Sequence, residues 1–469
     1  MQFYSLNFLY FFLIFYIIYL VLLKYPRGQN LWLLAASYVF YAFWDWRFLF
    51  VLISITAMSY LIGLGLGSSG SGDRANPLLR RSLLSAGLLI NLGTLVFFKY
   101  ADYFTDGLLR LFDRFNIPLD TLLVGVILPV GLSFYALQAC SYLWDVSARR
   151  IQPARNLLDF ALFTAFFPQL LAGPIERAGR MLPQFHQARK LTPATINAGI
   201  YLLFSGFFKK LVIADNLGVI ANTIFDNYTS YHGIDLLIAV LAFTLQLYAD
   251  FSAYSDIARG LARLLGFELM VNFRLPYFSA SPAEFWSRWH ISLSEWLRDY
   301  IFFPVRRALL RWKTPAAKLA ALLIPPLITM LVSGIWHGTG WNFIIWGLYH
   351  GVLMILFQML VKEHPRQPVN RPDRRSPSGF HSIWAWLLPK LGSGVGILFM
   401  FILICLGWLV FRVEDKQQFV YFLTHISLEA SLGSAMMWAN LVLFSLPLVA
   451  VQILQQARCD LLVLTRLPL

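Results

Sequence analysis

Apolar stretches long enough to cross a membrane recur along the whole chain, separated by short polar breaks. A helix of about 20 residues crosses roughly 30 Å of hydrocarbon, so each stretch predicts one membrane-spanning helix. The predicted spans are residues 6–23, 30–46, 48–66, 82–98, 122–145, 195–215, 234–256, 316–336, 340–360, 394–411 and 434–454. The pattern therefore predicts an all-α polytopic membrane protein, with residues 1–469 forming a single integral membrane domain.

One further apolar stretch, residues 157–171, has basic residues on both sides. Equal charge at its two ends favours a re-entrant or interfacial segment, which must be buried by other helices. Residues 167–185 are rich in Pro and Gly, which predicts broken helix and turn packed inside the protein.

Residues 257–315 are predicted to form an amphipathic segment on the cytoplasmic side. Apolar side chains between residues 285 and 300 repeat every three or four positions, the period of a helix with one apolar face. Ser281, Pro282 and Glu284 predict the helix start, with a capping hydroxyl, a proline at the first helical position and an acid in the first turn.

Composition agrees with a membrane protein, because hydrophobic residues make up 58% of the sequence and charged residues 13%. The mean hydropathy is +0.63. A net charge of +14 would suggest a nucleic-acid partner in a soluble protein, but most Lys and Arg fall between the spans. Orientation in the membrane explains them more simply, because positively charged loops stay cytoplasmic. No nucleic-acid partner is predicted.

The charge distribution also predicts sidedness. The loop from Asp215 to Asp235 carries no Lys or Arg and is expected outside, which gives an external N-terminus and a cytoplasmic C-terminus. The first span lacks the flanks of a cleaved signal peptide and is kept as a helix.

Two polar stretches are predicted to be loops, and neither is given a catalytic or binding role. Residues 67–77 are Gly/Ser-rich, and residues 362–393 begin with a Pro-rich basic run and read as a polar cytoplasmic linker. The three cysteines share no spacing typical of a zinc site or a disulfide framework, so no metal site is predicted.

Polar side chains gather at the end of one span, in LYADFSAYSDIARG, residues 247–260. Asp250 and Tyr254 share one helix face, and Ser252 and Asp256 share another. Ionisable groups inside a span are functional candidates, because burying them in lipid is costly. A hydrogen-bonded seam that joins helices is the alternative, and it is slightly favoured over direct catalysis.

Three histidines lie in or near apolar segments. His337 ends the 316–336 span beside Gly338, where a helix break is expected. On one continuous amphipathic helix His290 would lie one turn from its neighbours at positions 286 and 294. His350, deeper in the next span, is expected to be a packed or helix-bonded imidazole.

The segments RWHISLSEWLRDY and GIWHGTGWNFIIWGLYHG, which carry these histidines, closely resemble the membrane-bound O-acyltransferases. Further segments, including LPVGLSFYALQACSYLWDV and FPQLLAGPIERAGRMLPQF, extend the resemblance to most of the chain. The likeness is to the bacterial polysaccharide branch, which includes alginate and peptidoglycan O-acetyltransferases; the teichoic-acid D-alanyl transferases are more distant. The resemblance implies helices arranged around a central tunnel.

By this resemblance His337 corresponds to the family's catalytic histidine, and His290 to a second polar residue that is often Asn in other branches. The implied reaction moves an acetyl group from a cytoplasmic thioester, acetyl-CoA being the expected donor, to a hydroxyl outside. His337 would be the general base, while His290 would orient the thioester or stabilise the oxyanion. No permanently bound cofactor is expected. Candidates for substrate or tunnel contact are Trp336, Trp289, Arg288 and Asn342, together with Asp250, Ser252, Tyr254 and Asp256.

The resemblance also implies a location in the bacterial inner membrane, with periplasmic acetyltransferase partners and a polysaccharide synthesis or export complex. The acceptor is either the glycan or a hydroxyl on a partner protein. Other readings stay open: D-alanyl or other acyl transfer, and a covalent route through Cys140 or Ser252. A transporter of the acyl donor, for which the spans show no inverted repeat, and a scaffold for a polysaccharide synthase also stay open.

Overall fold

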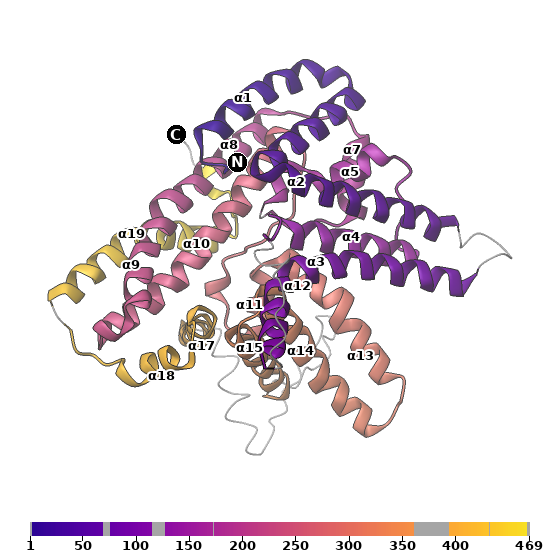
Figure 1. Cartoon of the computed structure of the whole chain (residues 1–469). Helices are drawn as coiled ribbons and strands as arrows, with labels where there is room; N and C mark the ends of the chain where they lie inside the picture. The colour runs from indigo at the N-terminus through magenta and orange to yellow at the C-terminus, as the bar shows by residue number, and fades with distance from the viewer. Residues whose placement is uncertain are drawn as a thin grey trace, which may run out of the picture. The chain divides into compact units, whose positions relative to one another are not determined.

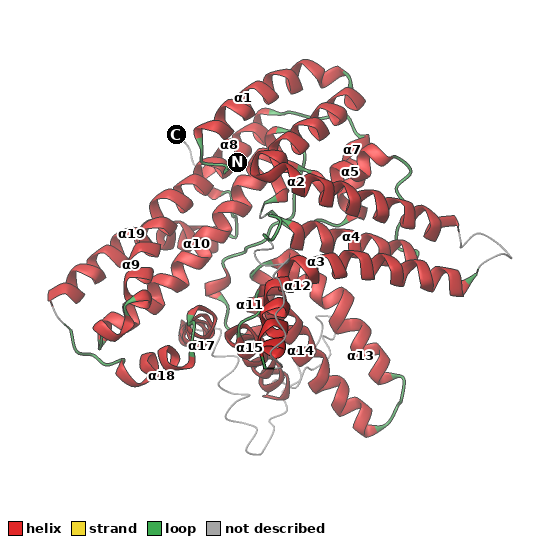
Figure 2. Ribbon diagram, in the orientation of Figure 1, coloured by secondary structure: helices red, strands yellow, loops and turns green. Residues whose placement is uncertain are grey.

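The computed structural model describes residues 2–68, 76–114, 127–171, 173–360, 394–430 and 432–466. Within these residues every regular element is helical (Figure 2), which confirms the predicted all-α class. The predicted 362–393 linker, most of the 67–77 loop and the first residues of the 122–145 span lie outside the described residues.

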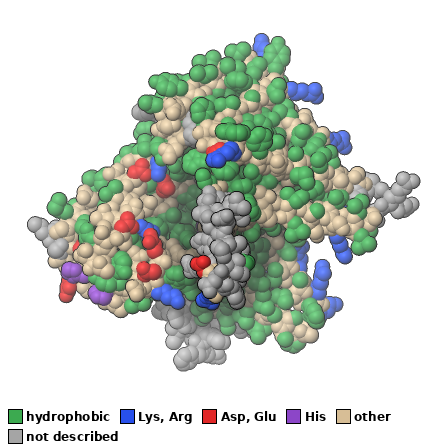
Figure 3. Space-filling model, in the orientation of Figure 1, with side chains coloured by type: hydrophobic (Ala, Val, Ile, Leu, Met, Phe, Trp, Pro, Cys, Tyr) green, Lys and Arg blue, Asp and Glu red, His purple; other side chains and the backbone are tan. Residues whose placement is uncertain are grey.

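Among the described residues, nine helices are long and apolar enough to cross a membrane, which confirms a multi-pass membrane protein. Eight of them are α1 (Leu6–Val21), α2 (Pro26–Ser68), α3 (Pro77–Asp113), α10 (Ile234–Leu264), α14 (Pro315–His337), α15 (Trp341–Leu360), α17 (Gly394–Arg412) and α19 (Leu432–Arg458), seen in Figure 1. The ninth joins α8 (Pro193–Phe208), a π-helical segment (Lys209–Ala214) and α9 (Asp215–Asp226). Hydrophobic side chains are spread over the face shown in Figure 3, as a lipid-facing surface requires.

Shorter helices lie between these spans. They are α4 (Leu132–Ser147), α5 (Leu157–Ala165), α6 (Phe167–Leu170), α7 (Ala178–His186), α11 (Pro282–Arg288), α12 (Ile291–Leu297), α13 (Phe303–Leu310) and α18 (Lys416–His425).

Helix α2 corresponds to two predicted spans. Its 43 residues would be about 65 Å long at about 1.5 Å per residue, roughly twice the hydrocarbon thickness. Asp45 interrupts it with φ −160° and ψ 115°, and its carboxylate accepts a hydrogen bond from the backbone N–H of Arg47 at 2.9 Å. Asp45 lies one residue before the end of the predicted span 30–46 and three residues before the start of the span 48–66, so the break falls close to the predicted boundary.

The chain forms two compact units. Unit 1 comprises Met1–Phe207 and Ala253–Val271, and unit 2 comprises Phe208–Ser252 and Asn272–Leu469. Helix α10 begins in unit 2 and ends in unit 1.

The core of unit 1 encloses the segment that was predicted to be re-entrant or interfacial. Residues 157–171 form α5 and α6, and the rings of Phe163, Phe166 and Phe167 are fully buried. The Phe167 ring lies 5.4 Å from that of Phe15 in α1. The segment is therefore short, broken and covered by other helices, as expected.

In unit 2, α14 and α15 form a closely packed helical pair. A Cβ on Gly334 would lie 2.2 Å from the carbonyl oxygen of Phe343, and one on Gly347 would lie 2.4 Å from that of Met330. Small residues let membrane helices approach this closely. The glycines thus fix the spacing of the pair that carries His337 and His350.

Candidate active site

The first half of the predicted amphipathic helix begins as expected. The Ser281 hydroxyl accepts a hydrogen bond from the backbone N–H of Glu284 at 3.1 Å, and the Glu284 carboxylate accepts one from the N–H of Ala280 at 2.8 Å. Pro282 is the first residue of α11. This pattern is a variant of the capping box in which Glu284 reaches the N–H of the residue before the cap, and it satisfies backbone donors at the helix start.

The prediction of one continuous helix through His290 is wrong. Helix α11 ends at Arg288, and α12 starts at Ile291. Between them His290 adopts φ 41° and ψ 54°, the left-handed region that residues with a Cβ seldom occupy. Such backbone outliers concentrate at functional sites.

The side chain of His290 lies inside unit 2, with 1% of the residue exposed. Its ring is 4.6 Å from the ring of Phe251 and 6.0 Å from that of Trp336. Burial lowers the pKa of His290 well below its usual value, and the nearby His337 lowers it further. His290 therefore stays neutral at neutral pH and can donate one hydrogen bond while accepting another.

His337 is the last residue of α14 and is half-buried. Three rings surround its imidazole, with centroids 4.8 Å away for Trp336, 5.1 Å for Trp346 and 5.2 Å for Phe411. Gly338 follows in extended conformation, and a Cβ there would lie 2.2 Å from the Phe343 ring. The glycine therefore permits the helix to stop beside the histidine, as the sequence predicted.

The Trp336 ring contacts both histidines. The structure thus brings together His290 and His337, which are 47 positions apart in the chain. His290 is fully buried and neutral, while His337 is partly exposed. A neutral imidazole with an open side can accept a proton from a substrate hydroxyl.

Asn342 and His350 lie on α15. The Asn342 amide donates a hydrogen bond to the carbonyl oxygen of Phe411 at 2.9 Å, so it fixes α15 against α17. His350 is 1% exposed and packs 5.0 Å from Trp346, and its ring nitrogens find no hydrogen-bond partner among the described residues. His350 is therefore a packed imidazole, although the structure shows no helix bond for it.

Arg288 and Trp289 flank the break. The Arg288 guanidinium pairs with Glu284 at 2.6 Å and reaches the carbonyl oxygen of Leu275 at 3.4 Å. Trp289 is 4% exposed, with its ring 4.8 Å from that of Trp408. Both side chains hold α11 within unit 2.

The polar residues of α10 in unit 2 meet two lysines. Lys210 lies 2.9 Å from a carboxylate oxygen of Asp250 and 2.9 Å from one of Asp215, while Lys209 donates a hydrogen bond to Ser252 at 2.9 Å. The lysines occupy the π-helical segment, a form frequent at functional positions. Sequence reasoning missed them, although two adjacent lysines inside the predicted 195–215 span were a visible signal.

Two further candidates belong to unit 1. Asp256 forms an ion pair with Arg259 at 3.2 Å, and Tyr254 packs against the hydrophobic core of that unit. Asp250 and Ser252 thus have partners on a neighbouring helical segment, as a polar seam between helices requires, whereas the ion pair of Asp256 lies within α10.

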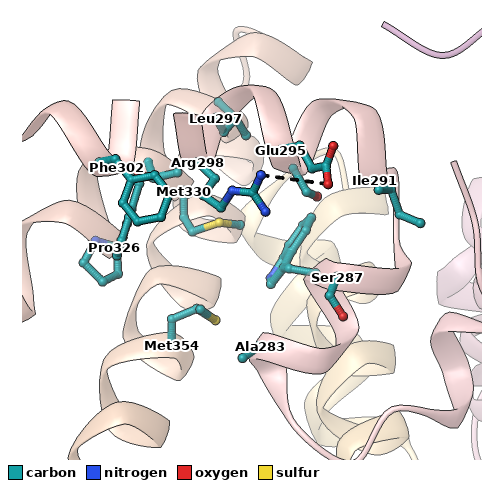
Figure 4. A pocket seen from close by; sticks show the side chains of 14 residues that line it. Ala283, Ser287, Ile291, Glu295, Leu297, Arg298, Phe302, Pro326, Met330 and Met354 are labelled. Carbon is teal, nitrogen blue, oxygen red and sulfur yellow. Dashed lines mark ion pairs between the residues drawn. The ribbon is translucent and has the colours of Figure 1, made fainter. Parts of the chain in front are cut away.

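A cavity of about 300 Å³ lies in unit 2 (Figure 4). Its lining comes from α11 to α15 and includes Ala283, Trp286, Ser287, Ile291, Ser294, Glu295, Leu297, Arg298, Phe302, Phe303, Pro326, Thr329, Met330 and Met354. Most of these side chains are apolar, while Glu295 and Arg298 pair at 3.9 Å. The cavity suits an apolar or mildly polar ligand better than a strongly charged one.

The cavity wall connects to His337 through two indoles. Trp286 lines the cavity, and its ring lies 5.8 Å from that of Trp346, which contacts His337. Neither catalytic candidate is itself a lining residue. The central tunnel therefore stays a prediction.

Comparison with known proteins identifies the chain. The family profile described as MBOAT, membrane-bound O-acyltransferase family, matches residues 146–402, which include both histidines. The chain belongs to the membrane-bound O-acyltransferase family. It is thus an acyltransferase embedded in a membrane.

Named relatives in this family share much of the sequence. The probable alginate O-acetylase AlgI of Pseudomonas putida is 38% identical over 389 residues, covering 83% of this chain and 73% of the relative. The peptidoglycan O-acetyltransferase of Helicobacter pylori is 31% identical over 84% of this chain and 73% of the relative. The teichoic acid D-alanyltransferase of Bacillus subtilis is 29% identical over 60% of this chain and 67% of the relative. The resemblance to this acyltransferase family is confirmed.

Proposed function

We propose that this membrane-bound O-acyltransferase moves an acetyl group from acetyl-CoA on the cytoplasmic side to a hydroxyl on the opposite side. The observation that carries the proposal is that His290 and His337 lie near each other and both contact the Trp336 ring. Both lie within the segment that matches the family profile. A neutral buried imidazole beside a half-open one supplies the two functions that acyl transfer needs, namely stabilisation of charge and removal of a proton.

In the proposed reaction the acceptor oxygen attacks the thioester carbonyl carbon while His337 takes the hydroxyl proton. The tetrahedral intermediate carries negative charge on the former carbonyl oxygen, and the neutral His290 donates a hydrogen bond to it. The carbon–sulfur bond then breaks, and the thiolate takes the proton from the His337 imidazolium. The products are an O-acetyl ester and free CoA thiol, so the step needs no other reactant.

We assign the acceptor to a polysaccharide exported to, or built at, the outer side of the membrane. Relatives named for alginate and peptidoglycan O-acetylation match more than four fifths of the chain and support this assignment. The D-alanyltransferase matches a smaller share at lower identity, which makes acetyl a better candidate than D-alanyl. An alginate-like uronic-acid polymer is the first acceptor to test, either directly or through a hydroxyl on a periplasmic partner.

The proposed location is the bacterial inner membrane, with the N-terminus outside and the C-terminus cytoplasmic. The charge bias of the loops supports this orientation. A cysteine introduced at Asn227, between α9 and α10, would react with an impermeant thiol reagent added outside intact cells. Labelling only after permeabilisation would reverse the assignment.

The decisive experiment uses purified protein in liposomes, with radiolabelled acetyl-CoA inside and candidate acceptors outside. The acceptors are uronic-acid oligosaccharides, a peptidoglycan fragment and lipoteichoic acid. We expect label on an external acceptor with wild type and none with His337→Ala. Export of intact acetyl-CoA without ester formation would show a transporter and contradict the proposal.

A further inference from the structure

The turn that carries His290 is capped from another segment of the chain. At most helix starts the residue before the first turn accepts a backbone hydrogen bond with its own side chain. His290 holds that position in α12, but its side chain caps nothing. Instead, the side-chain oxygen of Asn272 accepts the N–H of Ser292 at 3.2 Å, and its backbone oxygen accepts the N–H of Ile291 at 2.9 Å.

The segment that contains Asn272 also binds the end of α11, on the other side of His290. The backbone N–H of Arg274 donates to the carbonyl oxygen of Arg288 at 2.9 Å, at the end of α11. The Arg288 side chain returns to Leu275 and to Glu284. Residues 272–275 therefore bind the last residue of α11 and the first two of α12, on either side of His290.

The burial and hydrogen bonds of Asn272 indicate that its role is to hold the turn at His290. It is fully buried, and its amide nitrogen has no hydrogen-bond partner among the described residues, so only its oxygens are used. An unpaired buried amide N–H is costly, which means that a residue kept only for packing would be apolar. The left-handed backbone of His290 also costs free energy and persists only where surrounding contacts fix it.

We propose that Asn272 is a positioning residue, whose side-chain oxygen holds Ser292 and thereby keeps His290 in the left-handed conformation beside Trp336 and His337. Asn272 contacts none of the reacting groups and acts through the backbone of the turn. The catalytic consequence rests on the acyl transfer proposed above; the structural consequence does not. Substitution of Asn272 leaves its backbone oxygen in place, so the test isolates the bond to Ser292.

The test compares two Asn272 variants with a matched control. Asn272→Leu removes the acceptor at similar volume, whereas Asn272→Asp retains an oxygen at the same place. Gln418→Leu is the control, because Gln418 is also a buried amide in unit 2 that bonds two backbone groups, the carbonyl of Phe225 at 2.7 Å and the N–H of Glu414 at 2.9 Å. It lies outside the proposed site.

Two measurements are made on each full-length protein. The first is hydrogen exchange at the amides of Ile291 and Ser292, which needs no activity. We expect faster exchange at Ser292 in Asn272→Leu, and wild-type exchange at both amides in Asn272→Asp and in Gln418→Leu. The second is acetyl transfer in liposomes, where we expect kcat of Asn272→Leu to fall by about 10- to 100-fold with an almost unchanged KM, because misplaced groups weaken the transition state more than substrate binding.

Rescue of kcat in Asn272→Asp and retention of wild-type kcat in Gln418→Leu complete the expected result. Wild-type exchange at Ser292 in Asn272→Leu, or an equal fall of kcat in Gln418→Leu, would overturn the proposal. If Asn272→Leu does not fold, Asn272→Ala is measured in its place with the same expected outcome. Wild-type protein that transfers no acetyl group would contradict the proposed function, while the exchange at Ser292 would still decide the role of Asn272.

Discussion

The two histidines of unit 2 are held in place by different means. His290 sits in a left-handed turn between two seven-residue helices and is fixed by backbone hydrogen bonds from Asn272 and Arg274 on either side. His337 ends a 23-residue span and is fixed by packing against three aromatic rings and by the glycine that follows it.

Their exposure differs accordingly. His290 is buried, so the surrounding side chains restrict its imidazole and keep it neutral. His337 is only partly buried, so one side of its imidazole is accessible. A rigid neutral donor suits charge stabilisation, and a half-open imidazole suits contact with an incoming hydroxyl. The comparison therefore supports the proposal that His337 is the base and His290 the supporting group.

The largest expected effect comes from removing the base. His337→Ala should lower kcat by about 10³-fold, because general-base catalysis contributes roughly 10² to 10⁴. The assay is acetyl transfer in liposomes, with the thermal midpoint of each protein measured alongside. His337→Gln, which retains a polar side chain of similar length, should be equally inactive. Activity above about a tenth of wild type in either variant would reassign the base.

Removal of the His290 imidazole should lower kcat by a smaller factor than removal of the His337 imidazole. We expect kcat of His290→Ala to fall by about 10²-fold, the loss typical of one oxyanion donor. His290→Asn should retain more activity, because its amide can still donate one hydrogen bond. If kcat of His290→Asn falls as much as that of His337→Ala, the two histidines depend on each other in catalysis.

Packing around His337 can be tested without touching either histidine. Gly347→Ala should destabilise the protein by about 2 kcal/mol, because the new methyl group would overlap the carbonyl oxygen of Met330. Gly93→Ala in α3 is the matched control, since a Cβ there meets no atom within 4 Å. Thermal midpoints in one detergent measure both variants. Equal midpoints would contradict the close approach of α14 and α15.

The smallest effect concerns pH. Because the pKa of His290 is lowered in the folded protein, the unfolded chain binds more protons below about pH 6.5 and stability falls on acidification. The slope from this one group is at most about 1.4 kcal/mol per pH unit, and it vanishes above that range. The thermal midpoint of His290→Asn should therefore drop less between pH 7 and pH 5 than that of wild type. Parallel curves would show that His290 is not held neutral.

Much of the fold followed from the sequence. Apolar stretches located the spans, and the break in α2 at Asp45 lies close to the predicted boundary between spans 30–46 and 48–66. Ser281, Pro282 and Glu284 correctly marked the start of α11. These features are local, because hydropathy over about 20 residues and capping over four residues need no distant partner.

The site was only partly predictable. Family resemblance singled out His290 and His337, and the structure brought them together beside Trp336. The sequence pattern placed His290 on a continuous helix, since apolar side chains keep a helical period across the break. The neighbouring sequence did not predict the left-handed turn, because the hydrogen bonds that stabilise it involve Asn272 and Arg274.

The sequence by itself thus determined that this chain is a helical membrane protein, where its long apolar helices lie, and which histidines to examine. Only the tertiary structure decided that His290 is enclosed and turned out of its helix, and that Lys209 and Lys210 have partners on α10. The reason is physical. Membrane insertion depends on the sum of neighbouring side chains, whereas a strained backbone or a buried charge persists only when residues distant in the chain supply its hydrogen bonds.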